Sequence, residues 1–171
     1  LNDNEKALST INNAIKLLPT NIVYKLLKAD LLKDLGHFNE STSILLDLYS
    51  DKNINDKKDI LLMLSTVKKL DSNFKEAEKI LLEIIDSYPK FVNAYLNLSL
   101  LYFDKKLLKK AKKIGLRGFS IDPNIPEILI NLGVICRNLG EISESKKYLL
   151  KALSMNKRLF KCYENLSTFY D

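Results

Sequence analysis

The chain has little of what catalysis by side chains requires. Its 171 residues include one histidine, two cysteines and no tryptophan. The sequence contains no Ser-His-Asp order, no His/Cys spacing suited to a metal and no glycine-rich phosphate loop. We therefore predict no enzyme activity, no cofactor and no metal, and we expect the lone His37 to be an exposed turn residue.

The cysteines and the apolar runs bear on the cellular compartment. Cys136 and Cys162 are separated by 25 residues, which forms neither a CxxC motif nor a paired framework and favours a reduced, intracellular setting. The apolar runs Ile60–Leu64 and Ile128–Cys136 are much shorter than the roughly 18–20 residues of a membrane span. We expect a cytoplasmic protein without membrane contact, in which both cysteines are small buried side chains.

Chain-breaking residues are scarce as well. Five glycines and four prolines punctuate a sequence that is 46% hydrophobic and 28% charged. Such a chain is too apolar to be disordered, and it is long enough for one ordinary domain. The apolar positions recur at three and four residues, which predicts amphipathic helices joined by short turns.

A self-similarity at a period of 34 residues organises the sequence. Residues 92–125 carry a large residue, a leucine beside a small residue, an aromatic, a second small residue and a proline, and similar residues recur one period away on both sides. The matched sets are Tyr95, Leu98, Ser99, Tyr102, Ala111 and Pro123; downstream, Leu129, Leu132, Gly133, Cys136, Ser145 and Lys157; and upstream, Leu61, Leu64, Ser65, Lys68, Ala77 and Pro89.

This pattern resembles the tetratricopeptide repeat (TPR) over essentially the whole chain. The resemblance implies an all-α fold, a right-handed α-solenoid (superhelix) of tandem helix-turn-helix repeats. Each repeat would contribute a helix A and a helix B. A single array over residues 1–171 would comprise helix B of a partial repeat (1–21), four repeats (22–57, 58–91, 92–125 and 126–159) and helix A of a partial repeat (160–171). We expect both ends to be open and the chain to be a piece of a longer array.

Three local features depart from a regular array. Lys25 and Lys28 stand where apolar residues are expected, and a shift of one residue in register would correct this. Gly115 and Gly118 lie inside an expected helix. They could form a flexible point in that helix, but we favour a crowded helix crossing that requires small residues. Gly140, between two expected helices, is free to adopt a left-handed C-cap.

The resemblance implies that the A helices line a concave groove, and this groove is our candidate binding site. Three successive A helices place asparagine at one equivalent position: Asn97, Asn131 and Asn165. Because a side-chain amide both donates and accepts hydrogen bonds, such a column can bind an extended peptide backbone. It resembles the asparagine ladder in the TPR arm of O-linked N-acetylglucosamine transferases, and it stops upstream at Met63.

Apolar residues surround the expected ladder, which favours a protein or peptide partner with apolar side chains or an amphipathic helix. The further groove candidates are Leu62, Met63, Leu96, Leu100, Phe103, Ile130, Val134, Arg137, Glu164 and Thr168.

Alternative functions of other kinds stay open. The net charge of +6 and the lysines of 105–113 allow RNA binding, although the pattern favours a solvated outer face over a nucleic-acid site. The chain could also be the substrate-recruiting arm of a larger enzyme, such as a glycosyl- or sulfotransferase, or a spacer that self-associates through its open ends.

Overall fold

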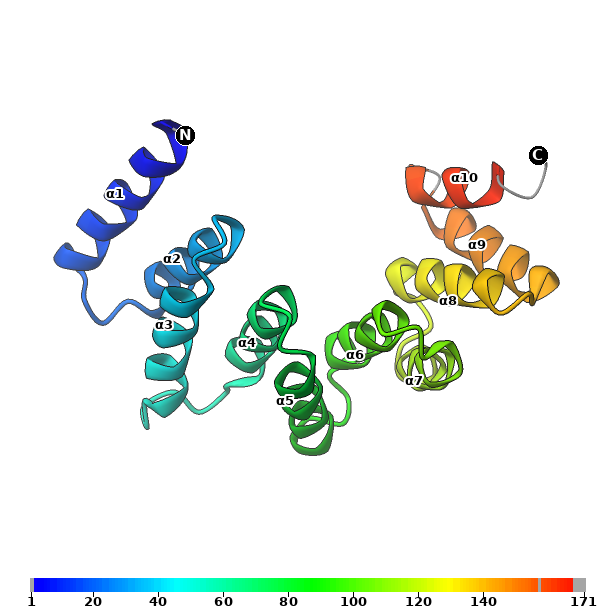
Figure 1. Cartoon of the computed structure of the whole chain (residues 1–171), viewed down its shortest axis with the longest axis horizontal. Coiled ribbons are helices and arrows are strands. Elements are labelled where there is room, and N and C mark those ends of the chain that lie inside the picture. The colour runs from blue at the N-terminus through cyan, green and yellow to red at the C-terminus, as the bar shows by residue number, and fades with distance from the viewer. Residues whose placement is uncertain (1, 157, 168–171) are drawn as a thin grey trace. The chain divides into compact units, whose positions relative to one another are not determined.

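The structure is a computed structural model that describes residues 2–156 and 158–167, and in these residues it contains helices and no strand (Figure 1). No helix among them is long and apolar enough to cross a membrane. The helices are α1 (Asn2–Leu17), α2 (Ile22–Asp34), α3 (Phe38–Ser50), α4 (Lys58–Leu70), α5 (Phe74–Ser87), α6 (Val92–Asp104), α7 (Leu108–Ile121), α8 (Pro126–Asn138), α9 (Ile142–Met155) and α10 (Phe160–Ser167).

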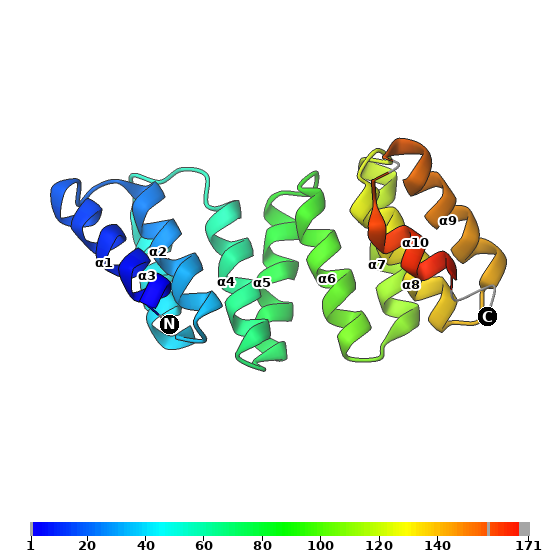
Figure 2. The same cartoon turned by 90° about the horizontal axis from the view of Figure 1, so that it is seen from above.

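The helices form two compact units, Leu1–Ile84 and Ile85–Asp171. In the first unit, α2 packs between α1 and α3, and it also contacts α4. In the second unit, α6 packs against α7 and α8 against α9, while α10 lies on both α8 and α9 (Figure 2). The helices α6 and α8 also contact each other. The helices α2, α4, α6 and α8 are the A helices of the expected repeats. Successive A helices therefore lie side by side within each unit, α2 beside α4 in the first and α6 beside α8 in the second.

The turns inside the helix pairs repeat one hydrogen-bonding pattern. At the turn between α8 and α9, the Glu141 amide donates to the Cys136 carbonyl at 2.9 Å, and Gly140 adopts a φ of +79°. This is the left-handed cap that the sequence predicted. Gly36 has the same φ between α2 and α3, whereas Ser72 and Lys106 adopt φ values of 62° and 61° at the equivalent places. The turn geometry is thus kept even where glycine is absent.

Buried serines join the helices of three pairs. The Ser41 hydroxyl of α3 donates to the Ala29 carbonyl of α2 at 2.7 Å, and the Ser145 hydroxyl of α9 donates to the Gly133 carbonyl of α8 at 2.6 Å. In the pair α6 and α7 the direction is reversed, because Ser99 of α6 donates to the α7 carbonyl of Ala111. Small residues at these crossings therefore let the backbones approach closely and also satisfy the serine hydroxyls.

The two glycines inside α7 lie at a crowded crossing, as the sequence analysis favoured. A Cβ added at Gly118 would lie 3.0 Å from Tyr95 Cβ and 3.3 Å from Ile128 Cδ1. A Cβ added at Gly115 would lie 2.9 Å from Leu132 Cδ2. Glycine thus gives α6 and α8 room against α7, at a cost of roughly 1 kcal/mol relative to alanine in a helix interior.

The expected register shift in α2 was wrong. Ala29 is fully buried against α3, as in the regular pattern, whereas Leu27 is 50% exposed. A slip of one residue would remove Ala29 from its crossing, so the lysines keep their places, half-buried. Long lysine side chains can cover apolar surface with their aliphatic stems. They line a cavity of about 180 Å³ formed by Ile15, Lys25, Lys28, Ile44 and Asp47.

Candidate functional site

The candidate site begins with two asparagines on neighbouring helices. Asn97 of α6 and Asn131 of α8 are 34 residues apart, at equivalent positions of helices that contact each other. Both side chains are half-buried. Within residues 2–156 and 158–167, neither side-chain amide has a hydrogen-bond partner. Each amide therefore keeps its donors and its acceptor available to a ligand.

The third expected ladder residue differs from the other two. The Asn165 amide nitrogen of α10 donates to the Lys161 carbonyl of its own helix at 2.6 Å. Glu164, beside it, is exposed. Thr168, the last expected groove residue, lies outside the described residues. Only the first two asparagines are thus without an internal partner.

Apolar side chains flank the two unpartnered amides. Leu96 packs against a core cluster of Val92, Ile128 and Leu132 and remains half-buried. Four other expected groove residues are also half-buried: Leu100, Phe103, Val134 and Arg137. The surface around the amides is therefore mixed, with apolar patches that are only partly covered.

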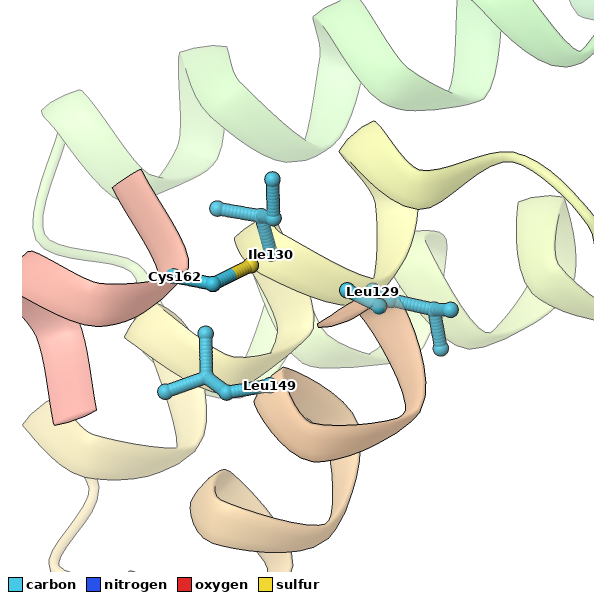
Figure 3. Close-up of a cluster of buried hydrophobic side chains, with 5 residues drawn as sticks. Leu129, Ile130, Leu149 and Cys162 are labelled. Carbon is cyan, nitrogen blue, oxygen red and sulfur yellow. The ribbon is translucent and has the colours of Figure 1, made fainter. Parts of the chain in front are cut away.

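Ile130 lies in the core of the second unit and not on an open surface. It is 8% exposed and packs in a cluster with Leu129, Leu149, Ala152 and Cys162. Figure 3 shows the Cys162 side chain of α10 pointing into this cluster. The sequence pattern placed Ile130 in the groove because it did not account for the packing of α10 against α8.

The two expected groove residues of α4 line a hollow in the first unit. Leu62 and Met63 are half-buried there, and the hollow has a volume of about 290 Å³. The sequence did not indicate its polar members, two of which come from α2 and two from α4. Together the lining residues are Asp30, Lys33, Asp59, Leu62, Met63 and Thr66. Lys33 is already paired, with its Nζ 2.5 Å from Asp30 Oδ1.

A cluster of possible metal ligands lies where the end of α8, the turn after it and the first turn of α9 meet. The ligand atoms of Cys136, Glu141 and Glu144 all lie within 4.8 Å of one another. However, the Lys112 ammonium lies 2.5 Å from Glu141 and 2.6 Å from Glu144, and these hydrogen bonds raise its pKa. A metal ion would have to displace a lysine that already neutralises both carboxylates. The arrangement fits an ion-pair link between Lys112 of α7 and the two glutamates at the start of α9.

Both thiols are buried, and burial raises the pKa of each. The pKa of Cys136 rises to about 12, from burial and a hydrogen bond with Glu141, and burial also raises that of Cys162. We predict that neither thiol of the folded protein reacts rapidly with an aromatic disulfide reagent at pH 8, because the thiolate is the nucleophile. Cys136 would hold roughly a thousandfold less thiolate than an exposed cysteine.

Reaction in urea provides the control for this prediction, because unfolding should release two fast thiols. Fast labelling of Cys136 or Cys162 before unfolding would contradict the burial described above.

The raised pKa of Cys136 also makes the stability of the protein depend on pH. The pKa of Cys136 is near 9 in the unfolded chain and about 12 in the folded protein. Burial of the neutral thiol therefore contributes fully to the free energy of unfolding below pH 9, and this contribution is lost as the pH rises from 9 towards 12.

Comparison with known proteins agrees with the helix pairs. The family model of the tetratricopeptide repeat matches residues 92–125 and 126–158. Superkiller complex protein 3 of Homo sapiens is 25% identical over 149 residues, which cover 84% of this chain and 10% of that protein. The chain thus spans about a tenth of the length of this curated relative.

Two solved structures share the fold over most of the chain. TTC0263, a thermophilic TPR protein of Thermus thermophilus, has a TM-score of 0.80 at 17% identity, covering 98% of this chain and 91% of that one. YrrB, a TPR protein with an unusual peptide-binding site, has a TM-score of 0.67 at 16% identity, covering 97% and 84%. The chain thus carries two tetratricopeptide repeats, at residues 92–125 and 126–158, and its helix pairs and small-residue crossings give it the fold of tetratricopeptide-repeat proteins over most of its length.

Proposed function

We propose that this chain is a non-enzymatic interaction scaffold that binds an extended peptide segment of a partner protein across α6 and α8. The observation that carries the proposal is the pair of half-buried, unpartnered amides of Asn97 and Asn131. We call the surface that they form with Leu96, Leu100 and Val134 the asparagine face.

The chemistry of the asparagine face suits a peptide backbone. An extended chain repeats donors and acceptors along its length, and each amide can pair with a backbone carbonyl and a backbone N–H at once. A hydrogen bond of this kind contributes about 0.5–1.5 kcal/mol net. Contacts with Leu96, Leu100 and Val134 would add apolar burial, so the side chains of the ligand would set selectivity and the amides would set its register.

The hollow of the first unit supports the same function. Leu62 and Met63 offer an apolar floor, and the Asp59 carboxylate has no partner within the described part of the chain. We expect this hollow to accept an apolar side chain. YrrB, which shares the fold, has a peptide-binding site by its own description, and this supports a peptide ligand here.

A second candidate function is that of a recruiting arm within a larger protein. The chain spans about a tenth of the length of Superkiller complex protein 3, whose name places it in a complex. In that case the same asparagine face would hold a substrate or partner for a domain elsewhere in the protein. Expression of the full coding region, followed by a test for an attached catalytic domain, would separate the two candidates.

The proposal is tested by peptide-display selection on the wild-type chain and on the Asn97→Ala/Asn131→Ala variant. We expect one peptide family to enrich on the wild type and to be lost from the variant. Asn165→Ala is the matched control, because that amide already bonds to its own helix, and it should retain the family. Circular dichroism must show unchanged helicity in both variants. Enrichment of the same family on all three proteins would contradict the proposal.

A further inference from the structure

A second hollow lies in the second unit, beside α7, and shares no residue with the asparagine face. Its volume is about 530 Å³, and it is lined by Lys109, Lys112, Lys113, Leu116, Leu139 and Glu141. Lys109, Lys113 and Leu116 follow one another at spacings of four and three residues, so they lie along one side of α7. Leu139 and Glu141 come from the turn between α8 and α9.

The lysines of this hollow have different partners. Lys112 is held between Glu141 and Glu144, and these three groups together carry one net negative charge. Within the described residues, the side chains of Lys109 and Lys113 form no ion pair or hydrogen bond. The hollow therefore presents two unpaired positive charges beside the partly exposed apolar surface of Leu116, which is 37% exposed.

Leu116 belongs to a pattern of exposed leucines. Single exposed apolar residues are ordinary on protein surfaces. Here, however, an exposed leucine stands at the equivalent position of α3, α5, α7 and α9, and in the last three of these helices a lysine precedes it by three residues. The leucines are Leu46, Leu82, Leu116 and Leu150, and the lysines are Lys79, Lys113 and Lys147.

We propose that the hollow beside α7 binds an acidic segment of a partner protein. Carboxylates of the segment pair with Lys109 and Lys113, and an apolar side chain covers Leu116 and Leu139. Charge complementarity carries the choice of occupant, because the chain has a net charge of +6 and the two lysines lack internal partners. A protein fits better than a nucleic acid, because no aromatic ring lines the hollow for base stacking and an apolar floor adds nothing to phosphate binding.

The test is fluorescence anisotropy of the whole 171-residue chain with three labelled probes. The first probe is a peptide of alternating Glu and Leu, the second is the same peptide with Ser in place of Leu, and the third is an oligouridine. We expect the first to bind most tightly, and the Lys109→Glu/Lys113→Glu variant to weaken it about tenfold or more. Leu116→Ser should weaken binding of the first probe by about threefold and leave binding of the second probe unchanged.

The matched control is Lys6→Glu/Lys16→Glu, which makes the same change in net charge on exposed residues of α1. It should leave the Kd of the first probe within about twofold of the wild-type value, because neither lysine lines the hollow and salt screens exposed charges. Equal weakening by both double variants, tighter binding of oligouridine, or no binding of the first probe would overturn the proposal. The Asn97→Ala/Asn131→Ala variant should bind the first probe normally, so failure here is distinct from failure of the asparagine face.

Discussion

Gly133→Ala is expected to lower the free energy of local unfolding of α8 and α9 even though alanine is the better helix former. The added Cβ would lie 2.7 Å from Leu149 Cγ and 2.8 Å from its Cδ2, and the branch atom Cγ cannot move aside by rotation of a side-chain end. Overpacking of this kind costs about 1–3 kcal/mol. The gain in helix propensity, about 1 kcal/mol, offsets only part of that cost.

A double-mutant cycle tests the cause of this effect. Leu149→Ala removes the clashing atoms and should by itself cost about 2–5 kcal/mol, because Leu149 is fully buried. The double variant should be more stable than the sum of the two single effects by about 0.5–3 kcal/mol. Native-state hydrogen exchange of the α8 and α9 amides supplies the free energies.

The control for the cycle pairs Gly133→Ala with Leu101→Ala. Leu101 is also fully buried, but it lies on α6 and not on α9. That pair should be additive within about 0.5 kcal/mol. If the Gly133 and Leu149 changes were additive too, the crowded contact would not be the reason for glycine at this position.

Cys162→Asp is expected to release α10 from the second unit. The thiol is fully buried among Ile130, Leu149 and their neighbours, where a carboxylate would have no partner (Figure 3). Burying an uncompensated charge costs several kcal/mol. An isolated helix of eight residues is not stable in water, so α10 should unfold once it leaves α8 and α9.

Limited trypsin digestion measures this release, because Lys161 would become a cleavage site in an unfolded segment. We expect cleavage there to rise by about tenfold or more in Cys162→Asp. Tyr163→Asp is the matched control, since Tyr163 is 50% exposed on the same helix and should leave cleavage near the wild-type rate. Wild-type resistance in Cys162→Asp would show that α10 does not depend on this contact.

The fold could be predicted from the sequence because a repeated pattern averages out local irregularities. Small residues at Gly133 and Ser145 predicted a close crossing, and the structure places them in direct hydrogen-bonding contact. Lys25 and Lys28 misled the prediction for α2. Charged residues at positions expected to be apolar suggested a shift in register, but the packing of Ala29 against α3 fixes the register. The aliphatic stems of the two lysines tolerate half-buried positions.

Less of the candidate site could be predicted, because the state of a side chain depends on its neighbours. The pattern treats Asn97, Asn131 and Asn165 alike, whereas the last bonds to its own helix. It also counts Ile130 as a groove residue, and only the packing of α10 shows that it is buried. The carboxylate of Asp59 carries no repeat signal, so the first-unit hollow emerges only from the three-dimensional arrangement.

The central claim is that the unpartnered amides of Asn97 and Asn131 bind a peptide backbone, and titration calorimetry with the selected peptide tests it most directly. Each of Asn97→Ala and Asn131→Ala should weaken binding by about 3–10-fold, which corresponds to the loss of one or two hydrogen bonds per amide. Asn165→Ala should change the Kd by less than about twofold. Equal losses at all three positions, or none at Asn97 and Asn131, would contradict the account.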